Sequence, residues 1–308
     1  MVLLNGKRIA VPAAIVLGLA VIGLGVAFAT GVFEEEIVRT APEEILVSPE
    51  WVQENADEVT ILDVGRDSDA FAEGHIPGAA FVDRVVVWDT VDGIDGMLPD
   101  PDIVAADLAE AGVSNDRPVV VYDGGNGLWA SRFFWAIEYL GHEQVHLLDG
   151  GIGAWSDSGL ELSETIEVPE RGDFVAEVRP RLIADKEFVL EQHENESFAI
   201  LDTRSQAEFT GEDVRSARGG HIPGSLNIDW TNNLSDADHF RPFEELAELY
   251  GDALEGRDGP AVTLCQTGVR GAHTYVVLRV LGEEDVRVYD GSWAEWGNDE
   301  TAPISNET

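Results

Sequence analysis

The sequence predicts an α/β fold with two similar domains in tandem, each a parallel sheet flanked by helices, after an N-terminal hydrophobic helix. Four short blocks occur twice along the chain, in the same order. Each copy alternates strand-length apolar runs with longer segments of helical periodicity, which is typical of a parallel sheet covered by helices on both faces. The uncharged segment 9–29 precedes both copies.

The repeated blocks set the domain limits. The matched pairs are residues 61–66 and 200–204, 74–79 and 220–225, 119–123 and 261–265, and 147–155 and 288–296. Matched blocks in one order indicate a duplicated domain. A polar connecting stretch at 169–180 separates the copies. We therefore place the domains at 44–165 and 178–302.

Within the first copy, residues 59–63, 119–122 and 145–148 are strand-length and rich in β-branched side chains. Residues 102–111 and 130–140 carry apolar side chains at helical spacing. Open α/β sheets bind ligands in the loops that follow the carboxyl ends of their strands. Residues directly after the apolar runs are therefore candidate site residues.

The segment 1–33 is expected to be a membrane anchor or a secretory signal. As a helix, residues 9–29 would span roughly 30 Å, the hydrocarbon thickness of a bilayer. Lys7 and Arg8 precede the run, and basic flanks stay in the cytoplasm. The Ala-Phe-Ala sequence at 27–29 also fits a cleavage site. Both versions place the folded domains outside the cytoplasm, either anchored to the membrane through residues 9–29 or secreted.

The charge is strongly acidic throughout the chain. The formal net charge is −40, and Lys7 and Lys186 are the only lysines. Acidic, lysine-poor surfaces are typical of proteins adapted to high salt, where ions screen self-repulsion. Nucleic acid is excluded as a partner because phosphate binding needs basic patches.

Cys265 is the only cysteine, so no intramolecular disulfide can form. It ends the apolar run 261–264 and is followed by a short loop and the helical pattern 272–278. Loop N–H groups and a helix dipole favour an anion, so we expect a thiol with a lowered pKa that acts as a nucleophile. Arg270 could hold an anion, and Gly268 permits a tight turn. The alternative is a buried structural cysteine.

Metal ions and other cofactors are not expected. The seven histidines are scattered along the chain, and the single cysteine is already expected to be a nucleophile. The glycine-rich residues 124–127 lack the lysine of phosphate-binding loops.

The two copies resemble tandem rhodanese domains, the family of thiosulfate and 3-mercaptopyruvate sulfurtransferases. The resemblance rests on the Gly-His-Ile-Pro-Gly segments at 74–78 and 220–224, the strand at 201–204, the loop 265–270, and residues 289–296. It covers nearly all of 44–302. It implies that the second copy is catalytic through Cys265. Asp123 takes the matching position in the first copy and cannot accept sulfur, so that copy is expected to be catalytically silent.

The resemblance implies a two-step sulfur transfer between small molecules. Cys265 would take sulfane sulfur from thiosulfate as a persulfide and pass it to cyanide or a thiol. The residues expected to bind the substrate are Gln266, Thr267, Gly268, Val269, Arg270 and Arg204. For Arg204, the alternative is an ion pair with Asp202 or Glu208.

Four other functions are weighed against thiosulfate sulfur transfer. A 3-mercaptopyruvate enzyme more often has serine where Thr267 stands, although Thr267 keeps a hydroxyl. A sulfur carrier or redox sensor would use the same persulfide without rapid turnover. A phosphatase or arsenate reductase would need five residues between cysteine and arginine, whereas four separate Cys265 from Arg270. A structural surface protein would leave the thiol unreactive.

Overall fold

The computed structural model describes residues 39–306. The hydrophobic helix and the segment 1–33 expected from the sequence lie outside this range. Among the residues that are described, we find no helix with the length and apolar character needed to cross a membrane.

The first sheet has five parallel strands in the order β1-β7-β6-β2-β3. They are β1 (Leu46–Val47), β2 (Thr60–Val64), β3 (Ala80–Val82), β6 (Val119–Tyr122) and β7 (Val145–Leu148). An antiparallel hairpin of β4 (Asp89–Val91) and β5 (Ile94–Met97) follows β3. This hairpin reaches the loop that follows β11 in the second domain, where Gly96 lies against Thr267.

The second sheet repeats the first. Its order is β10-β9-β11-β12-β8, again parallel throughout. The strands are β8 (Ile183–Ala184), β9 (Ala199–Asp202), β10 (Leu226–Asn227), β11 (Ala261–Leu264) and β12 (Val286–Tyr289). Read from the opposite edge, β8-β12-β11-β9-β10 matches the first sheet strand for strand. The predicted duplication and the predicted parallel sheets are therefore confirmed.

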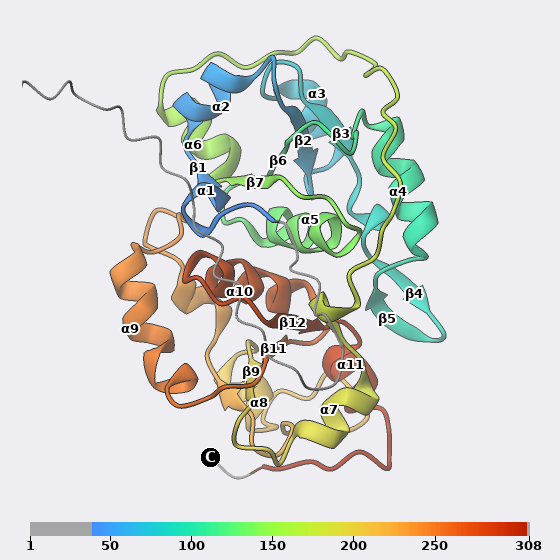
Figure 1. Ribbon diagram of the computed structural model, residues 1–308, viewed down its shortest axis with the longest axis vertical. Helices are drawn as coiled ribbons and strands as arrows, with labels where there is room; N and C mark the ends of the chain where they lie inside the picture. Colours follow the sequence, from blue (N-terminus) through green and yellow to red (C-terminus); the bar gives the residue numbers. More distant parts are fainter. Residues whose placement is uncertain (1–38, 307–308) are drawn as a thin grey trace, which may run out of the picture. The chain divides into compact units, whose positions relative to one another are not determined.

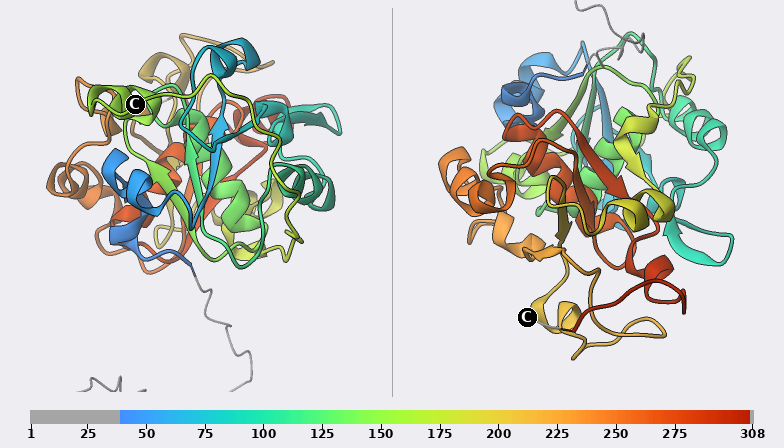
Figure 2. Two further views of the ribbon diagram at one scale, coloured as in Figure 1. Left: turned by 90° about the horizontal axis from the view of Figure 1, so that it is seen from above. Right: turned by 60° about the horizontal axis from the view of Figure 1, so that its bottom comes forward.

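Helices cover both faces of each sheet (Figures 1 and 2). In the first domain they are α1 (Pro42–Ile45), α2 (Pro49–Asn55), α3 (Ser68–Glu73), the 3₁₀ turn η1 (Arg84–Val86), α4 (Pro101–Glu110), α5 (Leu128–Tyr139) and α6 (Gly151–Asp157). In the second they are η2 (Pro180–Leu182), α7 (Lys186–Gln192), α8 (Gln206–Phe209), η3 (Trp230–Asn233), α9 (Phe243–Leu254), α10 (Val269–Val280) and α11 (Ser292–Trp296).

Strand β6 shows why the apolar runs are continuous rather than alternating. Val119 and Val121 join the core formed with α4 and α5, whereas Val120 and Tyr122 join the core formed with α2, α3 and α6. A strand that is buried on both faces needs apolar side chains at every position. The first of these cores continues through α5 and α10, which pack against each other, into the second domain.

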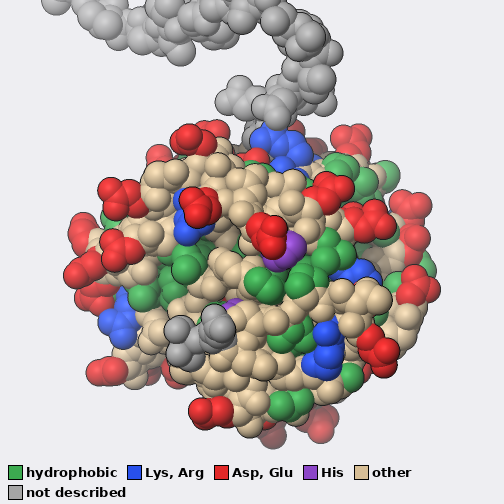
Figure 3. Space-filling model, turned by 90° about the horizontal axis from the view of Figure 1, so that it is seen from below, with side chains coloured by type: hydrophobic (Ala, Val, Ile, Leu, Met, Phe, Trp, Pro, Cys, Tyr) green, Lys and Arg blue, Asp and Glu red, His purple; other side chains and the backbone are tan. Residues whose placement is uncertain are grey.

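Acidic side chains are distributed over the surface, in keeping with the net charge of −40. The face drawn in Figure 3 carries many Asp and Glu side chains and fewer Lys and Arg. Arg204 and Arg270, the two arginines expected to bind the substrate, are both paired with carboxylates.

Candidate active site

Cys265 lies where β11 ends and the loop to α10 begins. The residue is buried, with 1% of its surface exposed. Gly268 is the N-cap of α10 and has a φ of 75°, a left-handed conformation that favours glycine. The loop 265–268 is thus a short connection between a buried strand and a helix of 12 residues.

One main-chain N–H group of this loop contacts the sulfur, and several others in the loop and the first turn of α10 have no acceptor in the described chain. The Thr267 N–H donates to Cys265 Sγ at 3.4 Å. Within residues 39–306, no acceptor pairs with the N–H groups of Gln266, Val269, Arg270 and Gly271. The last three are the first residues of α10, whose N–H groups have no partner inside the helix. They leave donors free for an anion at Cys265.

Arg270 is held beside Cys265 by a buried carboxylate. Its Nη1 and Nη2 donate to Glu208 Oε2 and Oε1 at 2.7 and 2.9 Å. Arg215 Nη1 lies 3.4 Å from the same carboxylate. Burial raises the pKa of Glu208, but the bonds from Arg270 outweigh it and lower that pKa to about 2. Burial lowers the pKa of Arg270, while its interactions with Glu208 and Cys265 together raise it above its ordinary value.

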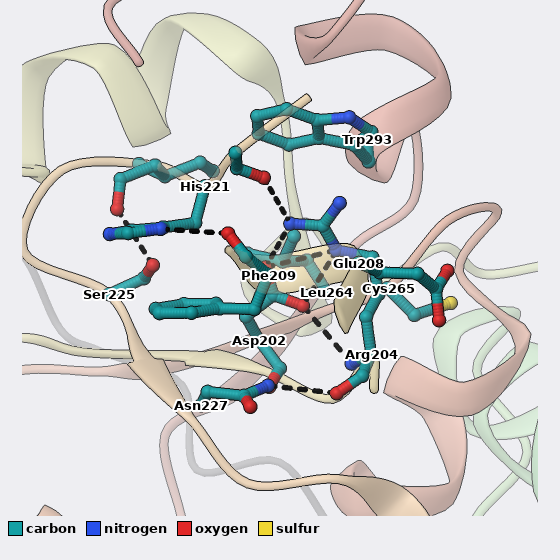
Figure 4. Close-up of polar contacts among 12 residues, drawn as sticks. Asp202, Arg204, Glu208, Phe209, His221, Ser225, Asn227, Leu264, Cys265 and Trp293 are labelled. Carbon is teal, nitrogen blue, oxygen red and sulfur yellow. Dashed lines mark hydrogen bonds and ion pairs between the residues drawn. The ribbon is translucent and has the colours of Figure 1, made fainter. Parts of the chain in front are cut away.

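Arg204 forms a buried ion pair with Asp202. Its Nε donates to both oxygens of Asp202, at 2.9 and 3.0 Å, and its Nη2 donates to the Gly220 carbonyl at 2.8 Å. The guanidinium stacks on Trp293 with its carbon 4.2 Å from the ring centroid (Figure 4). The side chain is 1% exposed. Of the two roles left open by the sequence, this geometry favours the ion pair over direct contact with a donor.

The remaining loop residues are supported from both domains. Gln266 Nε2 donates to Ser216 Oγ at 3.0 Å, and Val269 is buried. Thr267 lies against Gly96 in the β4–β5 hairpin, so closely that a side chain at Gly96 would collide with it. The first domain therefore covers part of the loop that follows Cys265.

Ser292, which the sequence analysis did not single out, binds both ends of the loop 265–268. Its Oγ accepts from the N–H groups of Cys265 and Gly268 at 3.2 and 3.1 Å, and it donates to the Tyr289 carbonyl at 2.8 Å. Its φ of 49° is strained for a residue with a side chain. Gly151, which matches it in the first domain, has a φ of 54°. The replacement of glycine by serine between the two repeats is the signal that could have identified it.

Glu208 was considered only as a partner for Arg204, and its pairing with Arg270 was missed. Its local sequence has a second explanation, because Ser205 and Glu208 form a capping box at the start of α8. A carboxylate that caps its own helix gives no sequence signal of an ion pair with a distant arginine.

The matching loop of the first domain binds a carboxyl group of its own, that of Asp123. Burial raises the pKa of Asp123, and the bonds from the loop N–H groups oppose that rise. This carboxyl group takes the place of Cys265 at the end of β6. It accepts four N–H groups at 2.9 to 3.2 Å, those of Gly125, Gly127, Trp129 and Ala130. Trp129 and Ala130 are the second and third residues of α5, as Arg270 and Gly271 are of α10. The same free helix N-terminus thus binds a carboxyl group in one domain and faces a thiol in the other.

Comparison with known proteins agrees with this geometry. The model of the rhodanese-like domain matches residues 48–158 and 185–299. The thiosulfate sulfurtransferase of Pseudomonas aeruginosa is 34% identical over 235 residues, which cover 76% of this chain and 86% of the relative. The sulfur carrier protein TtuD of Thermus thermophilus is 34% identical over 282 residues, covering 85% and 96%.

A solved structure extends the likeness to the fold. The crystal structure of SseA, a 3-mercaptopyruvate sulfotransferase from Escherichia coli, has a TM-score of 0.72 and 32% identity. It covers 80% of this chain and 98% of that one. With two domains of the same order and a single cysteine at the matching strand end, this chain belongs to the rhodanese family of sulfurtransferases.

Proposed function

We propose that this protein is a thiosulfate sulfurtransferase in which Cys265 carries the sulfur. The Cys265 thiolate attacks the sulfane sulfur of thiosulfate, a new S–S bond forms, and sulfite leaves with the electron pair of the bond that breaks. Cyanide or a thiol then attacks the outer sulfur of the persulfide. Thiocyanate or a new persulfide is released, and the Cys265 thiolate returns.

One observation carries this proposal: at the matching position of the first domain, main-chain N–H groups bind the oxygens of a side-chain carboxyl group. Four N–H groups hold the Asp123 side chain there, and main-chain donors at a helix N-terminus stabilise negative charge. Arg270 and Gly271 present the corresponding N–H groups beside Cys265 with no acceptor in the described chain. A thiolate and a persulfide are both anions that these donors would stabilise.

The charge around Cys265 supports an anionic donor. Four arginines around the loop are each paired with a carboxylate: Arg270 with Glu208, Arg215 with Asp213, Arg204 with Asp202, and Arg132 with Asp290. The side-chain charges therefore cancel, and the free N–H groups of α10 leave the site positive relative to the acidic surface. This favours thiosulfate, a dianion. The carboxylate of 3-mercaptopyruvate would be attracted in the same way, so that donor is the second candidate.

The experiment compares thiocyanate formation from thiosulfate and from 3-mercaptopyruvate, using the protein and its Cys265→Ser variant. Turnover with thiosulfate that disappears in the variant would support the proposal. Faster turnover with 3-mercaptopyruvate would assign that donor instead. One sulfur per protein, released by cyanide without further turnover, would identify a carrier or sensor. A thiol that alkylating reagents leave untouched at neutral pH would exclude all of these functions.

Two properties expected from the sequence remain proposals about where and how the protein works. Residues 9–29 would anchor it outside the cytoplasm or be cleaved on export, and fractionation of cells with a protease-accessibility test would decide between membrane, secreted and cytoplasmic pools. The net charge of −40 is expected to require high salt. Full activity and a cooperative fold at low salt would contradict this expectation.

A further inference from the structure

A buried arginine of the first domain lies directly beneath the catalytic loop of the second. Arg132, on α5, has 0% of its surface exposed. Its Nη1 donates to Asp290 Oδ1 at 2.6 Å, its Nη2 to the Gly96 carbonyl at 2.9 Å, and its Nε to the Val87 carbonyl at 3.1 Å. One guanidinium thus joins the β4–β5 hairpin of the first domain to the end of β12 in the second.

Asp290 connects this contact to Cys265. Its second oxygen accepts the Leu98 N–H at 2.7 Å. A Cβ placed on Gly268 would lie 2.9 Å from both Arg132 Nη1 and Asp290 Oδ1. Asp290 is also two residues before Ser292, whose hydroxyl binds the N–H groups at both ends of the loop. The ion pair therefore contacts the loop at Gly268 and supports it through Ser292.

The first domain has the same contact without the charge pair. Arg132 and His273 are each the fifth residue of their helices, α5 and α10. His273 packs beneath Gly127, stacks on Phe240 with ring centroids 4.5 Å apart, and has its pKa lowered to about 3 by burial. It is therefore neutral. Of the two matched contacts, only the one beneath the cysteine contains a buried charge pair.

We propose that Arg132 is a positioning residue for sulfur transfer, which fixes Gly268 and cancels the charge of Asp290 beneath the loop that holds the Cys265 anion. This inference rests on the proposed function. Without Arg132, the buried Asp290 carboxylate would lose its counter-charge and repel the thiolate and the persulfide. The loop would also lose its contact with the hairpin of the first domain.

The relevant readout is the pH dependence of Cys265 alkylation by iodoacetamide, because a purely structural role would not move its midpoint. Charged groups from several elements lie around Cys265. Glu208 on α8 pairs with Arg270 on α10 and with Arg215 in the loop after α8. Asp202 pairs with Arg204 at the end of β9, and Asp290 pairs with Arg132. In Arg132→Met all of these stay except the arginine itself. We expect the midpoint to rise by about one pH unit and thiosulfate turnover to fall at least about tenfold.

Two further variants separate charge from folding. The double variant Arg132→Met/Asp290→Asn removes both charges and is expected to return the midpoint close to that of the parent protein. Arg279→Met is the matched control, since Arg279 forms another buried ion pair between the domains, with Glu138 at 3.4 Å. It should lower stability without moving the midpoint. If Arg132→Met does not fold, Arg132→Lys keeps the charge and should keep the midpoint while slowing turnover.

An unchanged midpoint in folded Arg132→Met would overturn the inference, and so would an equal shift in Arg279→Met. These outcomes differ from a failure of the proposed function. In that case the parent protein would be alkylated at Cys265 yet form no thiocyanate from either donor.

Discussion

Replacing Glu208 with glutamine tests how Arg270 is held beside Cys265. The change keeps the size of the side chain and removes the charge that binds Arg270 through two bonds of 2.7 and 2.9 Å. Glutamine can accept from one Nη of Arg270, while its amide group faces the other donor. Because the Glu208 side chain is 2% exposed, water can replace little of what is lost.

The magnitude follows from the pKa of Glu208, which is lowered from 4.5 to about 2. At about 1.4 kcal/mol per pH unit, the ionised carboxylate contributes up to about 3 kcal/mol to the free energy of unfolding. A lowered pKa stabilises the fold above the unfolded value, and that contribution is lost as pH falls through the folded value. The cost of Glu208→Gln should therefore be full near pH 7 and disappear between about 4.5 and about 2.

The assay is denaturant unfolding of the parent protein and the variant at several pH values, with thermal unfolding as a second measure. A loss of 2 to 3 kcal/mol corresponds to roughly 5 to 10 °C in Tm. Glu245→Gln is the matched control, because Glu245 pairs with Arg241 at 2.9 Å but is 53% exposed. Exposed pairs contribute about 0 to 1 kcal/mol. Equal losses in the two variants, or a loss that persists at pH 2, would refute the reasoning.

Three other substitutions give separate outcomes in unfolding and thiocyanate assays. Ser292→Ala leaves two buried N–H groups without an acceptor and should cost about 2 to 4 kcal/mol and lower turnover at least tenfold. Asp123→Ala removes the acceptor of four N–H groups and should cost about 3 kcal/mol, with turnover per folded molecule unchanged. Gly96→Ala should displace the hairpin from Thr267, lowering stability by about 1 to 3 kcal/mol and raising KM.

The central elements of the fold could be predicted because local sequence determines them. Residues 119–122 and 145–148 were expected as strands and form β6 and β7, and the helix expected at 102–111 is α4 at Pro101–Glu110. The edge strands β1 and β8 have two residues each. Two residues carry no periodicity, so pairing with a neighbouring strand, rather than local pattern, makes these segments strands.

The sequence could group candidate site residues only where they are adjacent in the chain. Cys265, Gly268 and Arg270 belong to one loop, and strand-loop-helix geometry follows from sequence order. The ion pair of Arg132 with Asp290 joins residues from different domains. The sequence around either residue does not indicate this contact, because it depends on how α5 and α10 pack together.

Comparison of the two repeats supplies part of what local pattern lacks. A duplicated fold keeps the residues that every copy needs, such as His75 and His221, each bonded through Nδ1 to the carbonyl of a phenylalanine that it stacks on. The copies differ where only one is expected to carry sulfur. Four of the differing pairs around the site are Asp123 and Cys265, Trp129 and Arg270, Gly151 and Ser292, and Arg132 and His273.

The last of these pairs, Arg132 and His273, links each domain to the loop of the other domain. Arg132 belongs to the first domain but lies beneath the loop of the second, and His273 does the reverse. Each repeat therefore supplies the support of the other repeat's loop. Under the proposed role of Arg132, the first domain provides a buried charge that sulfur transfer at Cys265 needs. Loss of the first domain should for this reason abolish sulfur transfer even if the second domain folded alone.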